Sequence, residues 1–211
     1  MAFQNSPSAY GSGTRLFHWA VAALVLFQFG SIVLFRVLEE GGRDSAWTLL
    51  NGHKTAGLLV LILTTLRYLW RRLSPLPDWP VQFDAWDKHL THVVERGLYL
   101  AMFGMSLSGI GVELAAGHYV PFFDLFHLDA RAGILHAGAA SQAVDIKAAR
   151  AALMIPWLRD TLVGLHVLGA FATLVLLAAH LAHIIRHQVG LRNGLLLRML
   201  KGSAGEGGST P

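Results

Sequence analysis

The chain contains no cysteine among its 211 residues. This absence excludes disulfides, iron–sulfur clusters, covalent c-type haem attachment and thiolate zinc sites. Charged residues are also scarce, at 14%, whereas a typical soluble domain has about 25%. Hydrophobic residues make up 54% of the chain and its mean hydropathy is +0.47, so the composition indicates a membrane protein.

The net charge of +4 does not indicate a nucleic-acid partner, because no basic stripe with interleaved aromatic residues is present. In a membrane protein, an excess of Lys and Arg is typical of loops that face anionic lipid. Residues 1–14 form a polar segment without a charged side chain, so they lack the basic region of a cleaved signal. We therefore expect the first hydrophobic run to be a retained span.

Four apolar segments are long enough to cross a membrane, which takes roughly 17–25 residues. They cover about Leu16–Phe35, His53–Trp70, Gly97–Leu114 and Thr161–Ile185. No strand-like alternation of useful length is present, and only helices or closed barrels satisfy their backbone hydrogen bonds in lipid. The sequence therefore predicts an all-α fold, an integral membrane four-helix bundle.

The predicted domain covers residues 15–201, between the polar tail at 1–14 and a Gly/Ser-rich tail at 202–211 that we expect to be disordered. Three prolines, at positions 75, 77 and 80, predict an extended connection between the second and third spans. The connection between the third and fourth spans is long, about 115–160. Its Ala-rich part, Asp145–Met154, could form a short interfacial helix.

Histidine is the only haem or soft-metal ligand present in number, and two histidines share the fourth apolar span. His166 and His180 are 14 residues apart, which at about 100° per residue is close to four full turns, so both rings leave one helix face. At about 1.5 Å rise per residue they lie roughly 21 Å apart, one toward each side of a bilayer core of about 30 Å. His18 and His53 supply partners on other spans. The pattern predicts two haems, one at each level.

The alternating direction of the spans predicts which histidines pair. His18 lies near the start of the first span, whereas His53 opens the second span on the opposite side. The fourth span enters from that opposite side, so depth pairs His53 with His166 and His18 with His180. Both axial positions of each iron are then filled, and such haems carry electrons.

The distribution of positive charge predicts the orientation of the bundle. Ten of the 17 Lys and Arg residues fall on the side of the termini, including those of RYLWRR at the end of the second span. Because cytoplasmic loops carry the excess of Lys and Arg, we expect both termini to be cytoplasmic. The His53–His166 pair is then the outer pair and the His18–His180 pair the inner one.

Three further side chains are candidates for cofactor contacts. Arg67 lies at the depth of the inner haem, where a guanidinium could pair a propionate, and Lys54 could do the same for the outer haem. Alternatively, Arg67 snorkels as a membrane anchor and Lys54 caps a helix end among the headgroups. His187, seven residues past His180, could touch a quinone or relay a proton, or it could be a solvated juxtamembrane histidine.

Small residues and the remaining histidines carry weaker signals. Several glycines could admit a flat macrocycle, although small residues also let membrane helices pack: 30, 57, 104, 109, 164 and 169. His92 has the same alternatives as His187. The other histidines are expected at the surface or in loops, namely His89, His118, His127, His136 and His183.

Four segments resemble the prokaryotic cytochrome b561 family: TRLFHW, NGHKTAGLLVLILTTLRYLWRRLSP, HVVERGLYLAMFGMSLSG and GLHVLGAFATLVLLAAHLAHIIRH. The resemblance extends from about Thr14 to Lys201. It implies a multi-pass protein of the bacterial inner membrane with two haem b groups, whose ligands match His18, His53, His166 and His180. It also implies electron transfer between a periplasmic-side partner and the quinone pool, with His187 aligned near the quinone.

The resemblance leaves the electron donor open. Some members are similar to superoxide oxidases that reduce ubiquinone, and Lys54, Arg150 and Arg159 near the outer mouth could steer such an anion. The alternative is a membrane-anchor cytochrome b subunit that passes electrons to or from a redox protein such as a cytochrome c or a dehydrogenase. The long outer segment motivates this alternative. A transporter or scaffold without haem is the third hypothesis.

Overall fold

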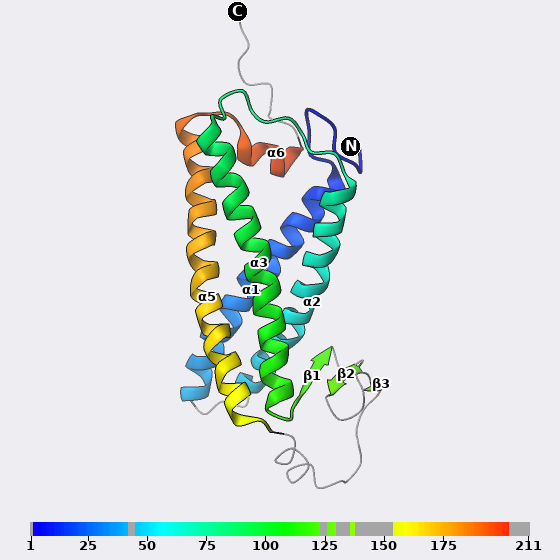
Figure 1. Ribbon diagram of the computed structural model, residues 1–211, viewed down its shortest axis with the longest axis vertical. Coiled ribbons are helices and arrows are strands. Elements are labelled where there is room, and N and C mark those ends of the chain that lie inside the picture. Colours follow the sequence, from blue (N-terminus) through cyan, green and yellow to red (C-terminus); the bar gives the residue numbers. More distant parts are fainter. Residues whose placement is uncertain (1, 42–44, 123–125, 130–135, 138–153, 203–211) are drawn as a thin grey trace, which may run out of the picture. The chain divides into compact units, whose positions relative to one another are not determined.

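The computed structural model describes residues 2–41, 45–122, 126–129, 136–137 and 154–202. It is mostly helical, and four helices are long and apolar enough to cross a membrane. They are α1 (Ser12–Glu40), α2 (Ser45–Leu73), α3 (Ala85–Ala115) and α5 (Pro156–Ile185), as labelled in Figure 1. The predicted helical membrane bundle is confirmed.

The helices extend beyond the apolar spans from which they were predicted. The clearest case is α3, which begins at Ala85 and not near Gly97. The carboxylate of Asp84 caps its first turn, because its Oδ1 accepts a hydrogen bond from the backbone N–H of Asp87 at 2.7 Å. A polar helix start of this kind carries no hydrophobic signal, so the apolar pattern alone misses it.

Many large apolar side chains on these helices are exposed. Leu16, Leu100 and Phe171 expose 67%, 75% and 65% of their surface, respectively. Exposed apolar surface on this scale is what a membrane-spanning helix presents to lipid tails. The chain is therefore a membrane protein that contacts lipid.

The chain divides into two units, and each of the four long helices contributes residues to both. Unit 1 comprises Met1–Ala22, Leu63–Ala101 and Ala172–Pro211, and unit 2 comprises Ala23–Ile62 and Met102–Phe171. Each proposed histidine pair falls within a single unit, so the two pairs are described separately below.

Close approach of α3 and α5 holds each unit together. In unit 1, a Cβ added at Gly97 would lie 2.9 Å from Cδ2 of Leu176. In unit 2, a Cβ added at Gly111 would lie 2.9 Å from Cδ1 of Leu162. Small residues let membrane helices approach closely, so these two glycines serve helix packing.

In unit 1, α5 continues into a π-helical turn, η1 (Arg186–Gly190), before the chain enters α6 (Leu195–Lys201). Gly194 between them has a φ of 68°, a left-handed conformation that glycine adopts without a steric penalty. Figure 1 shows α6 close to the N-terminal segment. Arg198 of α6 donates to the carbonyl of Asp78 at 3.0 Å, which ties α6 to the connection between α2 and α3.

The polar N-terminal segment is tied to the same unit by hydrogen bonds of Asn5. Its Nδ2 donates to the carbonyl of Pro75 at 2.8 Å, and its Oδ1 accepts from the backbone N–H of Gly11 at 2.9 Å. The carbonyl of Gly202 accepts from the backbone N–H of Tyr10 at 2.8 Å. Residues 203–211, where we expected disorder, lie outside the described residues.

In unit 2, the segment after α3 contains a small antiparallel sheet that the sequence did not predict. Its strands are β1 (Tyr119–Phe122), β2 (Phe126–Asp129) and β3 (His136–Ala137), in the order β1-β2-β3. The strands are too short for an alternating pattern to register. Thr55 of α2 donates to the carbonyl of Pro121 at 3.0 Å in a buried contact that anchors β1. The interfacial helix expected over 145–154 falls, except for its last residue, outside the described residues.

Candidate functional site

In unit 2, the rings of His53 on α2 and His166 on α5 lie with their centroids 6.4 Å apart and their planes at 76° to each other. A serine fixes the orientation of His166. The hydroxyl of Ser108 donates to the carbonyl of Met105 at 3.0 Å, so its oxygen accepts from Nδ1 of His166, also 3.0 Å away. Nδ1 of His166 therefore carries the proton and Nε2 presents the lone pair.

His53 is held in the same way. Its Nδ1 lies 3.2 Å from the carbonyl oxygen of Gln28 and 3.3 Å from Oγ of Ser31. Ser31 itself donates to the Gln28 carbonyl at 3.1 Å, so both oxygens accept from the imidazole. His53 and His166 thus each present Nε2 as a lone pair, the arrangement that backbone carbonyls and hydroxyls impose on metal-binding histidines.

In unit 1, the rings of His18 on α1 and His180 on α5 have their centroids 6.3 Å apart. Here a hydrogen-bond donor, not an acceptor, lies beside Nδ1 of one of the two histidines. Nη2 of Arg67 lies 3.2 Å from Nδ1 of His18. A guanidinium only donates, so Nδ1 accepts and the proton of His18 is on Nε2.

A second polar group lies beside Arg67. The guanidinium carbon of Arg67 is 5.5 Å from the centre of the Tyr99 ring. The hydroxyl of Tyr99 is buried and has no hydrogen-bond partner within the part of the chain that the structure describes. Arg67 and Tyr99 are therefore two neighbouring hydrogen-bond donors in unit 1. A single anionic group could accept a hydrogen bond from each of them.

The spacing within both pairs fits a shared metal ion. An imidazole nitrogen binds a metal at about 2.0–2.1 Å and lies about 1.1 Å from its ring centre, so two rings on opposite sides of one ion have centres roughly 6.3 Å apart. The observed separations are 6.4 and 6.3 Å. The tautomers of His53 and His166 leave one nitrogen of each ring free to bind such an ion. His18 could bind it through Nε2 only after Arg67 leaves Nδ1.

The six glycines expected to admit a macrocycle fall into two groups. A Cβ added at Gly57, Gly109 or Gly169 would lie 3.0, 3.1 or 2.7 Å from a neighbouring side chain, so these three serve packing. The other three have no described atom within 4 Å of an added Cβ, and all belong to unit 2: Gly30, Gly104 and Gly164. A flat ring or a lipid tail has room at these positions.

The positive charges expected near the outer pair are largely neutralised. Nζ of Lys54 lies 2.8 Å from Oε2 of Glu113, and Nδ1 of His118 approaches the same oxygen at 3.3 Å. Arg159 pairs with Asp160 at 2.8 Å. Lys54 thus pairs with the carboxylate of Glu113, and its contact with a haem propionate stays a prediction. Arg150 lies outside the described residues.

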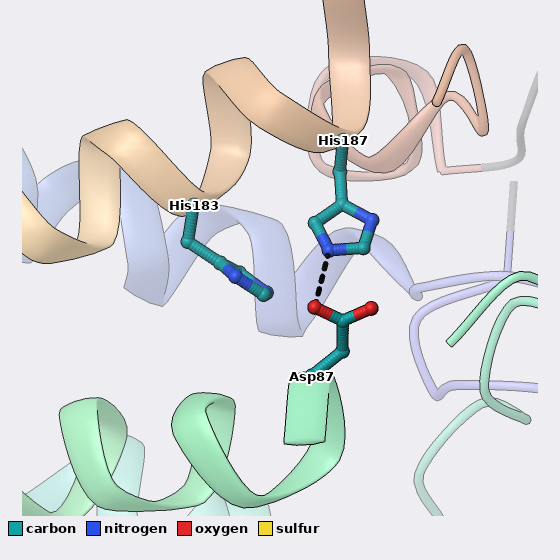
Figure 2. A group of neighbouring side chains, drawn as sticks. All are labelled: Asp87, His183 and His187. Atoms are coloured by element: carbon teal, nitrogen blue, oxygen red, sulfur yellow. Dashed lines mark ion pairs between the residues drawn. The ribbon is translucent and has the colours of Figure 1, made fainter. Parts of the chain in front are cut away.

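His183 and His187 belong to a buried cluster with Asp87 of α3, which the sequence analysis missed (Figure 2). The exposed fractions of the three residues are 9%, 0% and 1%, respectively. The expectation of a surface His183 and the alternative of a solvated His187 are both wrong, because Phe83 covers the two rings at centroid distances of 5.8 and 4.3 Å. The quinone contact of His187 stays a prediction.

The spacing of the two histidines on α5 and η1, four residues, was the available sequence signal for this cluster. Their partner Asp87 could not be found in the same way, because it lies outside the apolar span predicted for α3. Of the other histidines, His89 is exposed and His92 packs edge-on against Trp79 at 5.4 Å.

Two comparisons with known proteins agree. The family model described as prokaryotic cytochrome b561 matches residues 9–202 of this chain. Cytochrome b561 homolog 2 of Escherichia coli (strain K12) is 27% identical over 210 residues, which cover 99% of this chain and 100% of the relative. The matched range contains both histidine pairs and the buried cluster around Asp87.

Proposed function

The chain belongs to the prokaryotic cytochrome b561 family, and we propose that it is a di-haem cytochrome that passes electrons between a periplasmic-side partner and the membrane quinone pool. Family membership makes it a membrane electron-transfer protein with haem b. The number of haems, their ligands and the quinone are the proposal. We assign the axial positions of the outer haem to His53 and His166 and those of the inner haem to His18 and His180.

The single observation that supports this proposal most is the matched spacing of the two pairs. Centroid separations of 6.4 and 6.3 Å in different units suit one metal ion between each pair of imidazoles. When bound, haem supplies a one-electron carrier, and two axial imidazoles leave neither iron a free position for substrate. Electron transfer then depends on how the protein holds each imidazole.

At the outer pair, Ser108 and the Gln28 carbonyl hold the two Nδ1 protons, so both Nε2 lone pairs would be available to hold a haem iron. At the inner pair, ligation through Nε2 requires Nδ1 of His18 to carry the proton. The guanidinium of Arg67 is then repelled from it and needs another acceptor. We assign that acceptor to a haem propionate, which can accept from Arg67 and from the hydroxyl of Tyr99.

The proposal places the quinone on the inner side, in a bacterial inner membrane with both chain termini in the cytoplasm. A contact between quinone and His187 would require Phe83 to move, since its ring stacks on the imidazole at 4.3 Å and 29°. The proposal therefore does not depend on His187.

A specific observation favours a protein donor as the second candidate function. Thr55, two residues past His53, holds β1 through the Pro121 carbonyl. The small sheet is thus anchored next to an outer ligand, where a redox partner could dock. By contrast, the ion pairs of Lys54 and Arg159 weaken the case for steering superoxide.

Haem quantification tests the proposal. The purified protein should contain two haem b per chain, with a reduced-minus-oxidised α band. His166→Ala should retain the inner haem and His180→Ala the outer haem, whereas His89→Ala, at an exposed position, should retain both. A colourless preparation, or full haem content in either ligand variant, would refute the assignment.

The donor is tested separately. Mixing superoxide with the oxidised protein in a stopped-flow instrument should reduce the haems faster than superoxide dismutes if superoxide is the donor. Stoichiometric co-purification of a haem or flavin protein, with no reduction by superoxide, would select the membrane-anchor function.

A further inference from the structure

We propose that Asp87, His183 and His187 form a binding site for a divalent transition-metal ion of the Zn²⁺ class. In Figure 2 the three side chains converge from α3, α5 and η1. One ligand atom from each lies within 4.8 Å of the others, and all three residues are buried. Two imidazoles and one carboxylate form a ligand set that Zn²⁺ takes in proteins, with a fourth position left for water.

The hydrogen bonds of His183 leave a lone pair available. The hydroxyl of Thr91 donates to the carbonyl of Asp87 at 2.8 Å, so its oxygen accepts from Nε2 of His183 at 3.1 Å. Nδ1 of His183 therefore carries no proton. This atom is buried and has no hydrogen-bond partner among the described residues. An unprotonated imidazole nitrogen without a partner in a buried site is costly unless something binds it.

His187 points its Nε2 at the carboxylate, 3.3 Å from Oδ1 of Asp87, without the geometry of a hydrogen bond (Figure 2). On its other side, the amide of Asn193 lies 2.7 Å from Nδ1. The oxygen and nitrogen of an amide exchange places on rotation by 180°. Rotation would give up the 3.3 Å bond from the Leu195 backbone N–H and turn the amide NH2 toward that donor, a cost that ligation of the ion by His187 must offset. Asn193 would then accept from Nδ1, and Nε2 would present a lone pair to the ion.

The local backbone and an aromatic wall favour this use. His183 and His187 are four residues apart, the spacing with which histidines on one helix bind zinc together. The turn at His187 is π-helical, a feature frequent at functional sites. Phe83, 6% exposed, stacks on His187 and closes one side of the cluster to water.

Arg186 competes with the metal for the carboxylate. Its guanidinium forms an ion pair with Oδ1 of Asp87, the oxygen that also faces His187. The side chain of Arg186 is 51% exposed, so it can turn to solvent when an ion neutralises Asp87. The guanidinium of Arg186 and the metal ion therefore compete for the carboxylate of Asp87. Removal of the guanidinium should strengthen metal binding.

The test is Zn²⁺ titration of the purified, haem-loaded protein by calorimetry, together with X-ray absorption at the zinc edge, which does not detect haem iron. We expect one Zn²⁺ per chain with imidazole ligands at about 2.0–2.1 Å. His183→Gln and Asp87→Asn should weaken binding by more than about tenfold, and Arg186→Gln should strengthen it severalfold. His89→Gln, on the exposed face of α3, is the matched control and should bind as the wild type does.

The proposal is overturned if the wild type binds no stoichiometric Zn²⁺, if the absorption spectrum shows no imidazole, or if His183→Gln binds as tightly as His89→Gln. The haem α band reports whether each variant is folded. If a ligand variant loses haem, Asn193→Ala replaces it, because it keeps all three ligands and should still weaken binding about 10–100-fold. Unchanged affinity in Asn193→Ala would then refute the site. None of the overturning outcomes changes the haem count of the wild-type protein, on which the proposed function rests.

Discussion

Single neighbouring groups determine which imidazole nitrogen carries the proton in His53, His166 and His18. Ser108 and the Gln28 carbonyl leave Nε2 of His166 and His53 as lone pairs, whereas Arg67 imposes the other tautomer on His18. His53 and His166 thus have the tautomer that the proposed ligation through Nε2 requires, whereas His18 does not. Variants of the residues that contact these histidines should therefore affect the two proposed haems differently.

Ser108→Ala should weaken the outer haem selectively. The variant removes the acceptor 3.0 Å from Nδ1 of His166, and loss of such a supporting group costs about 10–100-fold in affinity. Haem retention during dilution in detergent measures the effect. The inner haem of the same molecule is the internal control, so equal loss of both haems would contradict the prediction.

Arg67→Gln should lower the reduction potential of the inner haem, because loss of a nearby positive charge favours the oxidised, more positive iron. The expected shift is tens of mV, on the scale of the 59 mV that changes a one-electron equilibrium tenfold. A spectroelectrochemical titration resolves the two potentials. Arg72→Gln, at an exposed position on the same helix, should leave both potentials unchanged, and so should Arg67→Gln if the guanidinium is only a membrane anchor.

For single residues, the sequence predicts those contacts that helix geometry alone determines. The structure brings together His53 with His166 and His18 with His180, as span direction and depth predict. The surroundings of His183 could not be predicted, since its burial depends on Phe83 in a connection between helices. The pairing of Lys54 with Glu113 likewise depends on how α2 and α3 pack, which hydropathy does not specify.

Among the elements, α3 and α5 are held at close range by glycine. Gly97→Val should destabilise the protein by about 1–3 kcal/mol, because a Cβ there would meet Leu176 at 2.9 Å and the branched side chain adds further overlap. Thermal unfolding in detergent, followed through the haem absorbance, measures the loss.

Leu100→Ala on the same helix is the control for Gly97→Val. The side chain of Leu100 is 75% exposed, and leucine and alanine both favour the helix. The control should therefore unfold close to the wild-type temperature. Equal destabilisation by both variants would show that α3 does not pack through Gly97.

The helices were predictable as elements because an apolar run of span length has few alternative structures in lipid. The ends of the helices were less predictable, as the polar start of α3 at Ala85 shows. The short strands β1 to β3 and the π-helical turn η1 were not predicted. Both depend on contacts and hydrogen bonds that leave no periodic pattern in the sequence.

For the whole molecule, the absence of cysteine allows a direct test of orientation. The proposed topology predicts that Lys201→Cys is protected from a membrane-impermeant thiol reagent in spheroplasts, because the C-terminus is cytoplasmic. Glu40→Cys, at the other end of α1, should react. Both positions are exposed, so the reverse pattern of labelling would invert the assignment of outer and inner pairs.

Because α5 contributes a histidine to both pairs, the proposed ligation fixes the number of residues between His166 and His180 more strictly than it fixes which residues they are. One inserted residue would swing the second imidazole about 100° around the helix, away from its partner on α1. Beyond Ile185, the wider turn of η1 accommodates an additional residue without breaking the helix. Tolerance to insertion should therefore be absent between His166 and His180 and return only in the part of η1 beyond His187, since the proposed metal site also depends on the spacing of His183 and His187.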